Sequence, residues 1–157
     1  MFYYTLNQAH ANDQFTIAVI GKTKNDSFYE QSSKGCLNFA SKVNNLKCIY
    51  DGADDYQDVR TQSIVIKELA DQNVDAFLVS TTDSEYLVTH ALKNLKKKNI
   101  PVLILDSDLL PKHQQYRLAY IGTNNFDFGV ALGELAKKYK KGEKPFVYSR
   151  GIKQHQI

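Results

Sequence analysis

Polar side chains follow the apolar runs of this sequence, where each run ends. Asp26 and Asp106 follow two different runs that are rich in β-branched residues. Carboxylates suit paired hydrogen bonds to neighbouring hydroxyl groups. Phe28 and Tyr29, close after Asp26, would offer a flat face to the apolar side of a sugar ring. These residue types together indicate binding of a small polar ligand that has one apolar face.

Other polar residues after apolar runs have a simpler explanation. They are Ser80 with Thr81 to Ser84, Ser107 with Asp108, and Thr123 to Asn125. Such residues also cap helices and form turns. We favour that alternative for Asp83, Ser84 and Asn125. It explains Asp26 and Asp106 less well, because they follow different inner strands on the same edge.

Motifs for catalysis are missing from these positions. Gly21-Lys22-Thr23 resembles the end of a phosphate-binding loop, which requires a glycine where Thr16 stands. Gly21 is alone in its turn, which disfavours dinucleotide binding. No G-x-S-x-G motif occurs, and no Cys or His pair repeats at the spacing of metal ligands. We therefore predict a non-enzymatic protein whose binding needs no cofactor and no metal.

Strand and helix patterns alternate along the chain. Short apolar runs predict buried strands, and apolar residues at helical spacing predict helices between them. The predicted strands are residues 15–20, 46–50, 75–80, 102–105, 118–122 and, starting late, 146–149. The predicted helices are about 28–43, 57–72, 85–98 and a last one that is capped by 123–125 and ends near 140. This alternation predicts an α/β fold with three layers, α/β/α, around a doubly wound parallel sheet.

The turn after the first strand is expected to lie at a ligand crevice. In open α/β sheets, ligands bind outside the carboxyl ends of the strands, where the strand order reverses. The turn from Asn25 to Tyr29 would lie there. In the helix that follows, one stripe at helical spacing is expected to face the sheet, with its glycine allowing close packing. Its members are Phe28, Ser32, Gly35, Cys36, Phe39 and Val43.

Length and charge narrow the class of protein. A chain of 157 residues is long enough for one domain with a real core and short for two. The formal charge is +3, and the lysines cluster at 93–98 and 137–144, in the last turns of predicted helices. Cations complement the helix dipole there. No base-reading motif accompanies them, so we predict no nucleic-acid partner.

The two cysteines and the N-terminal residues give information about the cellular compartment of the protein. Cys36 lies on the first helix and Cys48 on the second strand, so a disulfide is geometrically feasible, although we favour two buried thiols. No run of 18 apolar residues occurs, as a membrane-spanning helix would require. Ala9-His10-Ala11 has the form of a signal-peptidase site after a very short leader, so residues 1–14 are an N-terminal extension or the remnant of a signal peptide.

Three stretches in order resemble a known family. They are TIAVIGKTKNDSFYEQSSKGC, then IVIKELADQNVDAFLVSTTDSEYLVTHALKNLKKKNIPVLILDSD, then YIGTNNFDFGVALGELAKKY. Together they resemble the N-terminal lobe of type I periplasmic binding proteins. The ribose-binding branch is nearest, and the sugar-sensing domain of LacI-type repressors is similar. In that family two lobes close on a sugar or, in a related branch, on autoinducer-2.

The resemblance implies roles for particular residues. The turn residue before the aromatic pair corresponds to Asp26, and the stacking aromatics correspond to Phe28 and Tyr29. The other ligand-contacting positions correspond to Ser80, Asp106, Ser107 and Thr123. Ser107 stands where the family often has arginine, and loss of that bidentate cation argues against a ribose-like ligand.

The resemblance also implies the domain organisation and the function. Residues 15–149 would form the N-terminal lobe, and 150–157 the truncated start of a second lobe. The expected function is non-catalytic binding of a sugar-like solute for an ABC-type uptake system, in the periplasm or cell envelope, with a membrane permease as partner. The alternative is the ligand-sensing domain of a regulator or sensor kinase. A strand beginning at Phe146 would leave an open sheet edge, so some self-association is expected.

Overall fold

The fold is built on a parallel sheet of five strands. A computed structural model describes residues 14–56 and 58–139. The strands are β1 (Phe15–Gly21), β2 (Leu46–Gly52), β3 (Ala76–Val79), β4 (Val102–Leu105) and β5 (Ala119–Ile121). They are all parallel and lie in the order β2-β1-β3-β4-β5. The predicted α/β class and doubly wound parallel sheet are therefore confirmed; the predicted strand at 146–149 lies outside the described residues.

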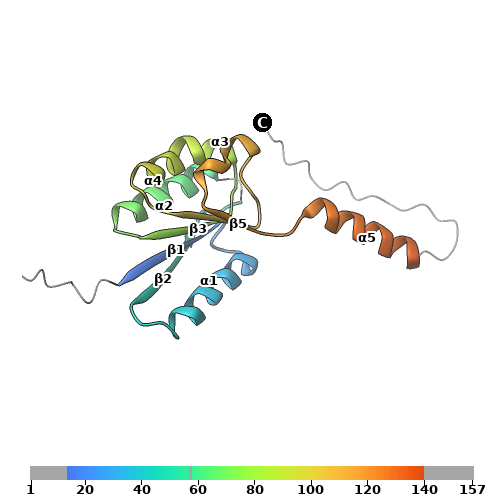
Figure 1. Cartoon of the computed structure of the whole chain (residues 1–157), viewed down its shortest axis with the longest axis horizontal. Helices are drawn as coiled ribbons and strands as arrows, with labels where there is room; N and C mark the ends of the chain where they lie inside the picture. The colour runs from blue at the N-terminus through green and yellow to red at the C-terminus, as the bar shows by residue number, and fades with distance from the viewer. Residues whose placement is uncertain (1–13, 57, 140–157) are drawn as a thin grey trace, which may run out of the picture. The chain divides into compact units, whose positions relative to one another are not determined.

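Helices cover both faces of this sheet. The helical segments of the sheet unit are α1 (Ser27–Ala40), α2 (Val59–Asp71), α3 (Ser84–Leu87), the π-helical segment η1 (Val88–Leu92), α4 (Lys93–Lys97) and the 3₁₀ segment η2 (Pro111–Tyr116), and a further helix, α5 (Asn125–Tyr139), belongs to a separate unit. Figure 1 shows α1 on one side of the sheet and α2, α3 and α4 on the other. The helix predicted at 85–98 is therefore present, but it contains one wider turn in its middle.

The chain divides into two compact units, Met1–Gly122 and Thr123–Ile157. The sheet and all helical segments up to η2 lie in the first unit. The second unit holds α5, which is capped as its sequence predicts: Asn124 Oδ1 accepts hydrogen bonds from the amides of Phe126 and Asp127. The predicted lobe of residues 15–149 takes in parts of both units, and its end lies outside the described residues.

The hydrophobic core lies between the sheet and the helices α2 to α4. Every second strand residue points into it, including Ala18, Ile20, Phe77, Val79 and Ile104. The register places these side chains side by side across β1, β3 and β4. Helix residues complete the cluster, among them Ile66, Leu69, Leu87, Leu92 and Leu95. This core holds β1 and β3 rigidly, which is what a site at their ends requires.

The orientation predicted for α1 is wrong. Phe28, Phe39 and Val43 are exposed, and the buried side chains are Tyr29 and Ser33. A shift of one residue turns a helix face by about 100°, because the helix has about 3.6 residues per turn. A β-carbon on Gly35 would meet no atom within 4 Å, so close packing does not explain this glycine.

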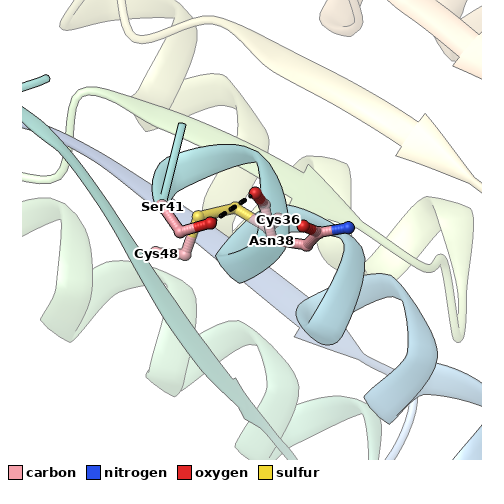
Figure 2. Close-up of a disulfide and its surroundings, with 4 residues drawn as sticks. All are labelled: Cys36, Asn38, Ser41 and Cys48. Carbon is pink, nitrogen blue, oxygen red and sulfur yellow. Dashed lines mark hydrogen bonds between the residues drawn. A yellow bond between two sulfur atoms is a disulfide. The ribbon is translucent and has the colours of Figure 1, made fainter. Parts of the chain in front are cut away.

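A disulfide joins α1 to the edge strand β2. Cys36 and Cys48 are bonded, with their Cα atoms 6.0 Å apart (Figure 2). The favoured prediction of two buried thiols is therefore wrong. The rotation of α1 explains the error, because Cys36 faces β2 from a half-buried position rather than lying in the core. Just beyond the bridge, Ser41 Oγ donates to Asn38 O at 2.8 Å and helps to end the helix.

None of the helices in the described part of the chain is both long and apolar enough to cross a membrane.

Replacing both cysteines by serine should lower the free energy of unfolding by about 3 kcal/mol. The bridge spans a sequence separation of 12, and closing a loop of about that length restricts the unfolded chain by roughly this amount. Urea unfolding of the oxidised chain and the double variant measures the difference. The reduced wild-type chain is the control and should match the variant. Equal unfolding midpoints in all three samples would contradict the prediction.

Candidate functional site

The reversal of strand order lies between β1 and β3. From β1 the chain moves to β2 on one side and then crosses to β3 on the other. The loops after β1, β3 and β4 all leave the sheet at the carboxyl ends of the strands, which form one edge of the sheet because the strands are parallel. Ligand sites in open α/β sheets form at such a point. The residues of these loops are therefore the candidate site.

Lys22, Tyr29, Asp106 and Ser107 form a connected polar cluster at this edge. Lys22 Nζ lies 3.2 Å from Asp106 Oδ2 and donates to Ser107 Oγ at 2.6 Å. The Tyr29 hydroxyl donates to Asp106 Oδ2 at 3.3 Å, and Ser107 Oγ lies 3.2 Å from the same oxygen. The cluster joins the β1 loop, α1 and the β4 loop through one carboxylate.

Asp106 is held by its backbone as well as by its side chain. Its φ angle is 64°, in the left-handed region that few residues other than glycine, asparagine and aspartate adopt. Its amide donates to Ile121 O, and its carbonyl accepts from the Tyr120 hydroxyl at 2.8 Å. Oδ2 makes the side-chain contacts with Lys22, Tyr29 and Ser107, and Oδ1 has no hydrogen bond from the described residues. The side chain is 28% exposed, so part of this side chain is open to solvent.

The ring of Tyr29 is buried, and its hydroxyl belongs to the polar cluster. Tyr29 is only 5% exposed, whereas Phe28 is 59% exposed. Burial, followed by the negative charge of Asp106, raises the pKa of Tyr29 far above its ordinary value, so the hydroxyl stays a donor. The two rings meet edge to face, with centroids 5.1 Å apart. Phe28 is therefore the ring of this pair that is open to a ligand.

Tight packing at the end of β1 fixes this arrangement. A β-carbon on Gly21 would lie 2.6 Å from Thr23 O and 3.0 Å from Tyr29 Cβ, so the turn leaves no space for a side chain. Asp26 caps α1, because its Oδ1 accepts from the Phe28 amide at 2.7 Å. Its capping role is thus observed, and its contact with a ligand stays a prediction.

The other two predicted site residues, Ser80 and Thr123, have different surroundings. Ser80 is completely buried, and its Oγ has no partner among the described residues. Thr123 lies in the second unit, where its hydroxyl bonds to Asn125. The structure therefore brings together Tyr29, Asp106 and Ser107, and joins Phe28 to them through Tyr29.

Sequence reasoning missed Lys22. It directly follows β1, at the same edge as the predicted residues, and its position was weighed only as part of a phosphate-binding loop. The signal that could have found it is its place at the carboxyl end of β1, the same end of the sheet at which Asp106 follows β4. No group of three His, Cys, Asp or Glu residues in the described ranges could hold a metal ion.

Comparison with known proteins identifies the family. A family model described as periplasmic binding protein domain matches residues 17–156. The chain belongs to this family. The resemblance read from the three sequence stretches is thus confirmed. Among curated proteins, none matches the chain significantly.

Solved structures of periplasmic binding proteins share this fold. An ABC transporter solute binding protein from Agrobacterium vitis with bound D-fucose is 28% identical, with a TM-score of 0.72 over 78% of this chain and 42% of that one. LsrB from Clostridium saccharobutylicum in complex with AI-2 is 23% identical, with a TM-score of 0.65 over 83% and 40%. The fructose-binding periplasmic domain of a hybrid two-component system is 23% identical, with a TM-score of 0.67 over 79% and 39%. The chain therefore spans about two fifths of the length of these proteins.

The ion pair between Lys22 and Asp106 should be coupled energetically. Lys22→Met should lower the free energy of unfolding by about 2 kcal/mol, because a shielded carboxylate loses its cation. With Asp106→Asn the loss should be smaller in the double variant than the sum of the single losses, by about 1 kcal/mol or more. Urea unfolding of the four proteins measures this coupling.

The control cycle uses Lys24 and Asp54, an ion pair that is much more exposed. Its coupling should be close to zero, since solvent screens exposed pairs. Equal coupling in the two cycles would show that Lys22 and Asp106 interact no more strongly than an ordinary surface pair.

Proposed function

We propose that this chain belongs to a non-catalytic binding protein for a small polyhydroxylated solute, of the sugar class. The observation that carries the proposal is the Asp106 carboxylate, which is fixed through Oδ2 and leaves Oδ1 to accept hydroxyl groups. Charged acceptors make stronger hydrogen bonds to hydroxyls than neutral ones do. The exposed ring of Phe28 would contact the apolar face of the same solute.

The charges of the cluster favour a neutral solute. Lys22 is paired with Asp106, so neither an anion nor a cation finds an uncompensated partner in this pair. A sugar needs none, because its hydroxyls can both donate and accept hydrogen bonds. The D-fucose, AI-2 and fructose named for the similar structures support a ligand of this chemistry.

Binding would occur by enclosure between two lobes. The similar proteins are more than twice as long as the matched region, which is consistent with a second lobe facing this one. The described lobe would supply the carboxylate, the lysine and the aromatic ring. Closure about a hinge would then exclude water from the ligand and strengthen these contacts.

Delivery to an ABC-type sugar uptake system is the role that we propose first. Its support is the likeness to ABC transporter solute binding proteins, of which the Agrobacterium vitis protein is one. The partner would then be a membrane permease. A second candidate is ligand sensing for a signalling protein, which the likeness to the periplasmic domain of a two-component system favours.

The disulfide supports a location outside the cytoplasm. Structural disulfides form and persist in oxidising compartments and are rare in the reducing cytosol. The Cys36–Cys48 bridge joins a helix to a strand of the fold itself. We therefore place the protein in the periplasm or cell envelope, in line with its family.

Asp106→Ala and Phe28→Ala should each weaken sugar binding by about 1–3 kcal/mol, because each substitution removes a side chain that would contact the bound sugar. Binding is measured by NMR titration of the ¹⁵N-labelled chain with D-fucose, the sugar named for a similar protein. The matched controls are Phe39→Ala, another exposed phenylalanine of α1, and Asp71→Ala, an exposed carboxylate at the end of α2. Unchanged affinity in both test variants would overturn the site assignment.

The 157-residue chain by itself should bind sugars only weakly, with a dissociation constant at about the millimolar level. Small polar ligands gain affinity chiefly when most of their surface is enclosed, and one lobe leaves much of it in water. Titration with D-fucose, D-glucose and D-fructose tests this. Micromolar binding would show that one lobe is sufficient.

A further inference from the structure

A single buried glutamine connects the two strands that flank the reversal point. Gln62 is 0% exposed. Its Nε2 donates to Gly21 O and to Ser80 O, each at 2.8 Å, and its Oε1 accepts from the Thr82 amide at 3.3 Å. Both protons and the oxygen of this amide group are thus used. All three partners are backbone groups, and they follow the paired parts of β1 and β3.

The strand ladder itself explains why these backbone groups need a partner. The paired register of β1 and β3 ends at Ile20 and Val79, and the Ser80 amide donates a last bond to Ile20 O at 2.9 Å. Beyond that point the two strands separate towards different loops. A buried carbonyl without a partner costs about 1–3 kcal/mol. The amide of Gln62 continues the ladder by one step, although it comes from a helix.

Helix α2 brings Gln62 to this place and holds it there. Gln62 lies in the first turn of α2, which Asp58 caps by accepting from the Thr61 amide at 2.9 Å. Ile66, one turn further along the helix, is completely buried in the core. The first turn of the helix therefore cannot shift without breaking either its cap or its packing.

The loops fixed by Gln62 are those of the candidate site. Gly21 is followed directly by Lys22, whose ammonium contacts Asp106 and Ser107. Ser80 begins the loop that ends at Asp83, the cap of α3. We propose that Gln62 is a positioning residue, which sets the separation of the β1 and β3 loops and thereby the position of Lys22 at the binding edge. This inference rests on the proposed function for its effect on binding, but its structural part does not.

The test uses Gln62→Met, which preserves the volume of the side chain and removes the amide. Amide hydrogen exchange should become at least tenfold faster at residues 22–25 and 80–83 and stay unchanged in the core of α2. The NMR titration with D-fucose should show at least tenfold weaker binding. Gln62→Asn, which keeps an amide that cannot reach both strands, should give the same result and serves where Gln62→Met fails to fold.

The matched control is Ile66→Ala. Ile66 is completely buried in the same helix, and its hydrocarbon side chain makes no hydrogen bond to a strand end. The substitution should lower global stability and leave D-fucose affinity within twofold of wild type, at a temperature where every variant is folded. A purely structural role for Gln62 predicts instead that affinity follows global stability in both variants. That result would overturn the proposal.

The outcomes for the two proposals can be told apart. If the wild-type chain binds none of the sugars, the prediction of millimolar binding by one lobe fails, and hydrogen exchange alone decides the role of Gln62. If exchange at 22–25 and 80–83 is the same in Gln62→Met as in wild type, the positioning role is wrong, whatever the sugar titration shows.

Discussion

The structure depends on the backbone of β1, which is hydrogen-bonded to a strand on each side. Ala18 to Ile20 are essentially inaccessible to water, so every amide and carbonyl there needs a protein partner. The parallel ladders to β2 and β3 supply these partners along most of the strand. Where the ladders stop, the chain turns outward, and other groups must replace them. The candidate site lies where that replacement occurs.

The groups that replace the ladder partners also make this end of the sheet polar. Lys24 donates its amide to Ala53 O, and the Thr23 side chain donates to Asp54 O, so the loop after β1 is tied to the loop after β2. On the other side the Lys22 ammonium reaches the loop after β4. The loop after β1 is therefore connected to both neighbours by polar contacts, and a ligand would meet a prearranged set of donors and acceptors. Such preorganisation lowers the cost of binding a flexible, well-hydrated solute.

The sheet could be predicted from the sequence because its strands are apolar runs bounded by polar turns. Buried parallel strands have this pattern, as residues 15–20 and 102–105 show, and the alternation with helices then restricts the topology. The face of α1 could not be predicted, because two stripes one residue apart carry similar apolar content. The disulfide depends on that rotation, so it was missed for the same reason. At the site, Asp106 and Tyr29 lie together, as their positions after strand ends suggest. The contact of Lys22 with Asp106 depends on the strand order, which places β4 beyond β3 in the sheet.

The positive φ angle of Asp106 limits how this site could change over generations. Only glycine, asparagine and aspartate adopt that conformation at low cost, and β-branched residues adopt it least readily. A lineage could therefore exchange the carboxylate for an amide or for no side chain with little loss of stability. Glutamate, threonine or valine at the same place would strain the backbone before any ligand is considered. New ligand preferences would thus arise more easily at neighbouring positions such as Ser107, whose backbone carries no such restriction.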